Sequence, residues 1–145
     1  MLWFKVLESL RDYLRAADIA DQVILGGYKP NDVRPDEKGK GLIFIQRDRE
    51  RPASDDLVQD MCVQVSVDTW VKSGVSYLEK GYRALAHLEG ALMDTLRRYE
   101  KETTYITDGV QLMRVRIIET SGDGDSVRPL VGSRTSLEII VYEET

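Results

Sequence analysis

Two residue types suited to nucleophilic chemistry occur once each in this chain, as Cys62 and His87. A thiolate activated by an imidazole needs the histidine and an orienting third group beside it in the fold. Cys62 lies inside an alternating apolar run without a Cys-His context. His87 lies well around a predicted helix from the stripe of Leu85, Leu88 and Leu92. We therefore interpret Cys62 as a small, half-buried residue and His87 as a solvated surface residue. One cysteine and one histidine also exclude an internal disulfide and a structural zinc set, which fits a reducing compartment.

Two glycine-containing turns resemble ligand loops only in part. Gly39-Lys40-Gly41 lacks the spacing of a phosphate-binding loop, and an apolar strand follows it where that motif needs a helix. Asp123-Gly124-Asp125 offers alternating carboxylates to calcium, but the rest of the EF-hand spacing is missing. We interpret the first as an ordinary loop and the second as a flexible acidic turn. No metal-binding or cofactor-binding residue is predicted.

An enzyme can also use carboxylates that are distant in sequence but converge in the fold. Asp68, Glu79 and Glu119 are the candidates in this chain. Such a site requires a cleft in which the pKa values of these carboxylates are strongly perturbed. The serines lack the G-x-S-x-G elbow of hydrolases, and no phosphate cradle or metal set accompanies them. We predict that the chain is not an enzyme, and we predict no catalytic residue.

Composition limits the remaining classes of protein. A chain of 145 residues fits one domain, and we expect residues 1–145 to form it. Lys and Arg number 20 against 25 Asp and Glu, which gives a net charge of −5 and disfavours generic binding to DNA or to membrane surfaces. Charged residues interrupt the apolar N-terminal segment, so it lacks the uninterrupted core of a signal peptide. We expect a soluble protein that is intracellular or assembled inside a cell.

The first half of the chain alternates helix, strand and charged segments. Apolar residues at three- and four-residue steps predict a helix from Leu2 to Ala17. A short strand is predicted at Gln22–Leu25 and another at Leu42–Ile45, separated by a loop over 26–41 that is rich in glycine, proline and charge. Residues 46–56, QRDRERPASDD, are predicted as a charged connection because they cannot be buried cheaply.

The second half begins with a strand that alternates over Met61–Val71. Its odd-numbered valines form one face, and Cys62, Gln64, Ser66, Asp68 and Trp70 form the other, which we expect to be wet or covered by a partner. A long amphipathic helix is predicted from Leu78 to Tyr99.

Two further alternating runs, Val110–Glu119 and Ser136–Tyr142, are predicted as antiparallel neighbours joined by a loop over 120–135. Arg114 or Arg116 would then face Glu138 across the pair. Extra strand pairing is possible at Thr103 to Ile106. The predicted order is αβββαββ, an α+β fold with an antiparallel or mixed sheet and helices packed on it.

Aromatic residues and long loops point to a protein that interlocks with neighbours. Trp3 and Phe4 open the first helix, and Trp70 points away from the valine face, so we expect aromatic surface to remain uncovered in a monomer. Loops of the predicted length are usually functional or disordered. The alternative is that Trp70 lies under a helix and the loops are merely mobile.

The arrangement of these segments resembles the tail terminator and tail completion proteins of long-tailed bacteriophages and prophages. The resemblance lies in a first helix of the LESLRDYLRAAD kind, the strands GLIFIQRD and CVQVSVDTW, the helix YRALAHLEGALMDTLRR, and the closing RVRIIET and SLEIIVYEE. It implies a small α+β structural subunit that forms a ring, hexameric in the family, on the end of the tail tube, where the filled head docks. The ring would close by head-to-tail contacts.

The implied partners are further copies of the chain, the tail tube protein, and a head-completion or connector protein, with no cofactor, membrane or sequence-specific nucleic acid. The implied location is the tail or neck of a virion assembled in the cytoplasm of a bacterial host. No motif carries individual positions over from the family. Loop position, charge and aromatic character alone predict these interface residues: Trp3, Phe4, Arg47, Arg49, Arg51, Trp70, Asp123, Asp125 and Arg128.

Two alternatives stay open. The loop over 26–41 matches no fixed family feature, so another phage neck or minor capsid component would look similar. A small ligand-binding or regulatory α+β module is the alternative from a different class of protein, and it should show one well-formed apolar pocket with a few convergent polar groups.

Overall fold

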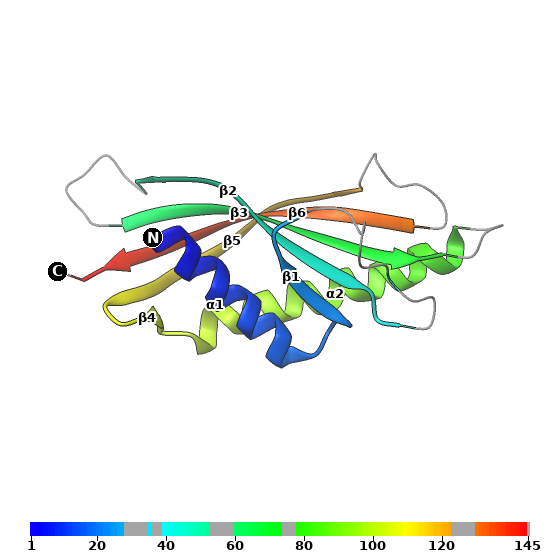
Figure 1. The fold of residues 1–145 in the computed structure, drawn as a ribbon, viewed down its shortest axis with the longest axis horizontal. Helices are drawn as coiled ribbons and strands as arrows, with labels where there is room; N and C mark the ends of the chain where they lie inside the picture. Colours follow the sequence, from blue (N-terminus) through cyan, green and yellow to red (C-terminus); the bar gives the residue numbers. More distant parts are fainter. Residues whose placement is uncertain (28–34, 36–38, 53–59, 74–77, 123–129, 145) are drawn as a thin grey trace.

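The structure is a computed structural model that describes residues 1–27, 35, 39–52, 60–73, 78–122 and 130–144. Two helices and six strands follow one another along the described parts of the chain (Figure 1). Their bounds are α1 Leu2–Ala17, β1 Gln22–Leu25, β2 Leu42–Pro52, β3 Asp60–Lys72, α2 Glu79–Glu102, β4 Tyr105–Thr107, β5 Val110–Gly122 and β6 Leu130–Glu143. The predicted α+β class and element order are confirmed, with β4 as one short additional strand near the extra pairing expected at Thr103 to Ile106.

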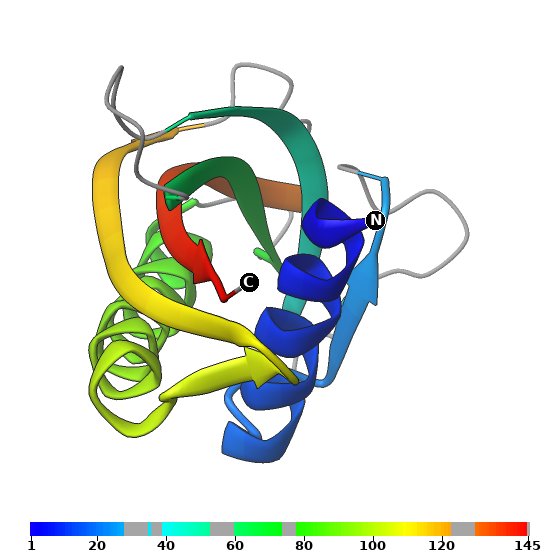
Figure 2. The same cartoon turned by 90° about the vertical axis from the view of Figure 1, so that its left-hand side faces the viewer.

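All six strands join one sheet in the order β1-β2-β3-β6-β5-β4. The sheet is mixed, because β1 runs parallel to β2 while every other neighbouring pair is antiparallel. Figures 1 and 2 show a strongly curled sheet with α1 and α2 on the same side of it, the helix face. The opposite side is the open face, because none of the described helices covers it.

Helix α1 has the bounds that its apolar spacing predicts. Val6, Leu7, Leu10 and Leu14 form its buried stripe, and they pack on the helix face of the sheet. The helix ends at Asp18, which adopts a left-handed conformation with φ 54° and donates its backbone N–H to the carbonyl of Arg15. Aspartate tolerates this conformation better than most residues, so the chain can turn at this point without glycine.

Helix α2 supplies the other half of the core. Its buried leucines and Tyr99 face the sheet, as their helical spacing predicts, but Tyr82, predicted on the same stripe, is 58% exposed. The helix runs three residues beyond the predicted end at Tyr99, to Glu102. Tyr99 is fully buried, and its hydroxyl bonds the Ser9 hydroxyl of α1 at 2.8 Å. Burial raises the pKa of Tyr99 to about 12, against a smaller lowering by the Ser9 bond. This contact joins the two helices beneath the sheet.

The central strand β3 pairs with β2 on one side and with β6 on the other. Val63, Val65 and Val67 lie on the helix face and are buried in the main core, as predicted. The prediction that the other face of β3 would be wet is wrong, because Cys62, Ser66, Asp68 and Trp70 are also buried. Side chains from neighbouring strands cover them on the open face of the curled sheet.

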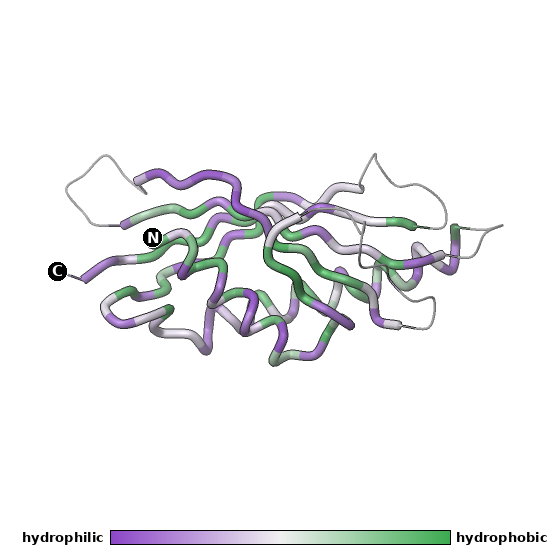
Figure 3. The backbone as a smooth tube through the Cα atoms, viewed as in Figure 1, coloured by the Kyte–Doolittle hydropathy of each residue, from purple (hydrophilic) through white to green (hydrophobic). Residues whose placement is uncertain are grey.

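Strand β2 is much longer than predicted. The sequence prediction ended it at Ile45 and treated the following charged residues as a connection, but Gln46–Pro52 continue the pairing with β3. Figure 3 shows the change from an apolar first half to a hydrophilic second half along this one strand. The prediction was wrong because β2 is flanked by β1 only as far as Ile45, so its second half is an edge whose side chains need no burial.

Strands β5 and β6 are also longer than predicted. The predicted loop over 120–135 is too wide, since β5 continues to Gly122 and β6 begins at Leu130. The two strands are antiparallel neighbours, as predicted, and Arg116 lies opposite Glu138 with an ion pair of 3.4 Å. Among the described residues, neither helix is long and apolar enough to cross a membrane.

Candidate assembly interface

Five of the nine predicted interface residues come from one side of the molecule, the start of α1 and the second half of β2. The rings of Trp3 and Phe4 meet edge to face with centroids 5.7 Å apart. The Arg47 guanidinium lies 4.0 Å from the centre of the Trp3 ring, an attractive cation–π geometry. Phe4 remains 40% exposed, and Met1 at the start of the same helix is 85% exposed. This α1–β2 corner therefore presents apolar and cationic surface together.

The three arginines of β2 do not share one face of the sheet. Arg47 pairs with Val65 and lies on the helix face, whereas a register shift between Arg47 and Arg49 puts Arg49 opposite Gln64, on the open face. Arg51 lies opposite Cys62 and therefore shares the open face with Arg49. An extra residue in one strand reverses the side-chain alternation beyond it. The alternating arginines of the sequence are thus divided between the two sides of the sheet.

The prediction that Trp70 would contribute to an exposed aromatic surface is wrong. Trp70 is only 1% exposed, and it packs on the open face with Leu42 and Phe44. Gly132 lies opposite Trp70 on β6, and a Cβ there would come within 2.6 Å of the indole ring. The missing side chain makes room for the indole. Trp70 is therefore a packing residue, and neither the expected exposure nor burial under a helix is right.

Asp123, Asp125 and Arg128, the last three predicted interface residues, lie outside the described residues.

A second arrangement of arginines surrounds Glu138 at the middle of the open face. Arg51 donates to Glu138 Oε2 at 2.8 Å, and Arg116 approaches Oε1 at 3.4 Å from the opposite side. Cys62 Sγ and Gln64 Nε2 also donate to Oε2, each at 3.4 Å. Glu138 is buried, while both arginines are about half exposed. The cluster links β2, β3, β6 and β5 across the sheet.

Burial alone would raise the pKa of Glu138. The hydrogen bonds from Cys62, Gln64 and Arg51, together with the charge of Arg116, outweigh burial and lower the pKa. For Cys62, burial and the bond to the carboxylate both raise the pKa of the thiol. A buried thiol with a raised pKa is a poor nucleophile, which agrees with the structural interpretation of Cys62.

We expect Glu138→Gln to lower the free energy of unfolding by about 1 kcal/mol at pH 7, since both arginine partners are half exposed. A lowered folded-state pKa contributes stability that is complete above the unfolded pKa and is lost as the pH falls through the folded pKa. Urea unfolding should therefore show the difference from wild type shrinking toward pH ~3. Exposed Glu119→Gln is the control, expected to change little at either pH. A difference for Glu138→Gln that grows in acid would contradict the assignment.

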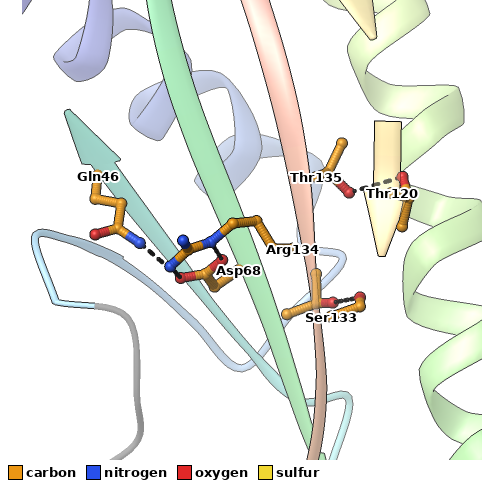
Figure 4. A network of polar contacts seen from close by, with 7 residues as sticks. Gln46, Asp68, Thr120, Ser133, Arg134 and Thr135 are labelled. Atoms are coloured by element: carbon orange, nitrogen blue, oxygen red, sulfur yellow. Dashed lines mark hydrogen bonds and ion pairs between the residues drawn. The ribbon is translucent and has the colours of Figure 1, made fainter. Parts of the chain in front are cut away.

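Further along the open face, Asp68 is fully buried and accepts hydrogen bonds from Arg134 and Gln46 (Figure 4). Arg134 donates through two nitrogens, at 2.8 Å and 3.1 Å, in a fork suited to a carboxylate. Gln46 Nε2 donates at 2.8 Å. The Asp68 network ties β2 to β3 and β6. On the helix face of the sheet, Thr120 and Thr135 bond each other at 3.1 Å and tie β5 to β6.

The candidate catalytic carboxylates do not converge. Asp68 is held in the ion pair with Arg134, and Glu119 is exposed on β5, with β6 between them. Glu79 lies at the start of α2, on the opposite side of the sheet from Asp68. His87 is exposed on α2, as predicted. Among the described residues, no group of three or more histidine, cysteine, aspartate or glutamate side chains is arranged to hold a metal.

Sequence reasoning missed a group of exposed apolar residues on β5. Met113, Ile117 and Ile118 of β5 are 52%, 36% and 48% exposed. Met113 and Ile118 fall at the two register shifts between β5 and β6. The sequence signal was the adjacent pair Ile117-Ile118, because two neighbouring apolar residues in an alternating strand indicate a bulge. These residues lie on the side of the sheet opposite β1 and β2.

Two surface hollows among the described residues have mixed linings. One of about 260 Å³ lies beside the end of α1 and β1, where Arg15 already donates two hydrogen bonds to the Val23 carbonyl. The other, of about 220 Å³, is lined by Tyr13, Ala16, Ala17, Arg98 and Glu102. Neither has the mainly apolar lining expected of a small-molecule pocket.

No family model matches this sequence, and no curated protein matches it. Among solved structures, the fold is similar to a chain in a structure described as "Virion of native gene transfer agent (GTA) particle". The TM-score is 0.58 with 10% sequence identity, and the match covers 94% of this chain and 93% of that chain. The two chains therefore share their fold over almost their whole length.

Proposed function

We propose that this chain is a structural component of a phage-like virion, and that it terminates the tail tube by forming a ring at the head–tail junction. The observation that carries the proposal is the similarity in fold, over 94% of this chain, to a chain of a virion particle. The sequence resemblance to tail terminator and tail completion proteins supports the same role and supplies the position at the end of the tail. The role is mechanical, and it requires neither catalysis nor a cofactor.

The geometry of the subunit supports assembly by head-to-tail contacts. The strand order puts β1 and β2 at one lateral side of the sheet and β5 and β4 at the other, and Figure 2 shows α1 beside β1 and β2 with the end of β4 reaching it. Exposed apolar residues occur on both sides, Met1 and Phe4 on the first and Ile117 and Ile118 on the second. Contacts between two different surfaces repeat from copy to copy, and they close into a ring when the rotation allows.

The proposed ring contacts the tail tube protein on one face and a head-completion or connector protein on the other. DNA passes through the centre of such a ring during packaging or delivery. The net charge of −5 suits a passage that DNA must cross without sticking. The closest alternative within the structural class is another neck or minor capsid component of the same kind of particle.

Light-scattering mass after size exclusion, over a concentration series, tests the proposal. We expect a species of about six times the chain mass of 16.5 kDa, in equilibrium with smaller forms at low concentration. A chain that is monomeric at every concentration contradicts ring assembly. In that case a ligand-dependent rise in melting temperature should be sought, because it would favour the small-molecule-binding module.

A further inference from the structure

Two strand segments lack a second neighbour in the described part of the sheet. Strand β1 flanks β2 only from Leu42 to Ile45, and β4 with its preceding residue flanks β5 only from Val110 to Leu112. Gln46–Arg51, named the β2 open edge, and Arg114–Glu119, named the β5 open edge, therefore pair on one side only. An edge of this kind presents backbone N–H and C=O groups to another extended strand.

The two open edges lie at the same level of the sheet. Following the registers through β3 and β6, Gln46 is level with Glu119, and Arg47 is level with Ile117. At the other end, Arg51 is level with Arg114. The open edges of two copies placed side by side therefore match in level, whereas Thr120–Gly122 of β5 are level with the part of β2 that β1 already flanks.

Backbone groups on both open edges point outward. The Val115 N–H donates to the Glu100 carboxylate at 2.7 Å, away from β6, so alternation directs the backbone groups of Ile117 outward as well. On β2, the Ile45 carbonyl accepts the Gly26 N–H at 2.6 Å, away from β3, and alternation makes Arg47 the next outward residue. The backbone groups of Arg47 and Ile117 therefore point outward at the centre of each edge, while the outward Val115 N–H is already bonded by Glu100 of α2.

Strand direction favours the same pairing. Each step from β2 through β3 and β6 to β5 is antiparallel, so β5 runs opposite to β2. In a ring, rotation about the central axis superposes each copy on the next, so the strands of every copy have the same direction relative to that axis. Strand β5 of one copy therefore runs antiparallel to β2 of the next copy. Antiparallel pairing is slightly more stable per residue than parallel pairing.

Ile117 of the β5 open edge and Phe4 of α1, beside the β2 open edge, are exposed apolar residues on the same side of the sheet. Ile117 pairs with Leu137 and lies on the helix face, the same side of the sheet on which α1 carries Phe4. Joining the edges brings the Ile117 side of one copy toward the Phe4 corner of the next. The β2 open edge is rich in charge, as protected edges usually are, whereas the β5 open edge exposes Ile117 and Ile118 between Arg114, Arg116 and Glu119.

From these observations we propose that the β5 open edge of one copy pairs with the β2 open edge of the next copy, so that the sheet continues from subunit to subunit. The inference rests on the proposed ring and names its subunit contact. The occupant of each edge is an extended strand of a second copy, and the pairing is a form of β-strand addition.

Cysteine crosslinking between two separately prepared variants tests the contact. Asp48→Cys and Ile118→Cys place thiols at exposed positions in the middle of the two open edges. A short bismaleimide should crosslink the mixture into a dimer and should leave each variant alone uncrosslinked, since the contact joins unlike edges. His87→Cys, exposed on α2, replaces either partner as the control. Wild type reports any reaction of buried Cys62.

A second variant tests the contact without crosslinking. Ile117→Lys with Ile118→Lys should shift assembly to at least tenfold higher concentration while circular dichroism still reports a folded chain, because lysines on an edge strand oppose strand addition. Tyr82→Lys replaces another exposed apolar residue, 58% exposed on α2, and should assemble like wild type.

The outcomes separate the contact from the ring. A crosslink in the mixture alone, with assembly lost only in the double lysine variant, supports the pairing. The pairing is overturned, and the proposed ring is retained, if the wild type forms rings, the lysine variant assembles equally well and the mixture gives no crosslink. Crosslinking of either cysteine variant by itself indicates like edges in contact and also overturns it. A wild type that never assembles overturns both proposals.

Discussion

Gly41→Ala is expected to lower the free energy of unfolding by roughly 2–5 kcal/mol, because it adds both backbone strain and a steric clash. Gly41 has φ 104°, a backbone conformation that other residues rarely adopt. An added Cβ would lie 2.7 Å from the Trp70 carbonyl oxygen and 2.8 Å from Leu88 Cδ2. The carbonyl belongs to β3 at the centre of the sheet, so it cannot move away cheaply. Urea unfolding followed by circular dichroism measures the loss.

The matched control is the same substitution at Gly90. This glycine is exposed on α2, and no atom lies within 4 Å of its added Cβ. Alanine is the better helix former, so Gly90→Ala should raise the free energy of unfolding by about 0.5–1 kcal/mol. Equal effects at the two positions would show that the tight approach of β2 to β3 and α2 is wrong.

Trp70→Ala should cost about 3–5 kcal/mol, since it removes a fully buried indole from the open-face cluster with Leu42 and Phe44. Trp3→Ala should cost about 1 kcal/mol, mainly the Arg47 contact and part of the apolar packing. Chemical unfolding of the two variants side by side measures the contrast.

Fluorescence gives an independent check on Trp70. A Trp3→Phe chain retains Trp70 as its single tryptophan. Its emission should be blue-shifted and resistant to acrylamide quenching, because the indole is 1% exposed. Strong quenching, with a stability loss no greater than that of Trp3→Ala, would restore the expectation that Trp70 lies at an uncovered surface.

Elements with one buried face were predictable from the sequence. In α1, the stripe of Val6, Leu10 and Leu14 gave its bounds, and in β3 the alternating valines did the same, because burial on one side imposes a period on apolar residues. The second half of β2 carries no such period. Its arginines and carboxylates belong to an edge, and a charged edge strand has the composition of a loop.

The candidate interface was predictable only in part. The ion pair of Arg116 with Glu138 followed from strand alternation and from the prediction that β5 and β6 are antiparallel neighbours. The burial of Trp70 did not, since it depends on Gly132 opposite it, which only the register of β3 with β6 reveals. The open edges could not be found either, because they depend on where β1 and β4 end along their neighbours.

Electron microscopy of the largest species from size exclusion tests the central claim most directly. The proposed assembly predicts closed rings with a central hole and one repeated contact between unlike sides of the subunit. Class averages should show a single rotational symmetry, and the subunit sheets should run on from copy to copy around the ring. Compact two-fold dimers, or particles with no hole at any concentration, would contradict the claim that this chain is a ring-forming component of a virion.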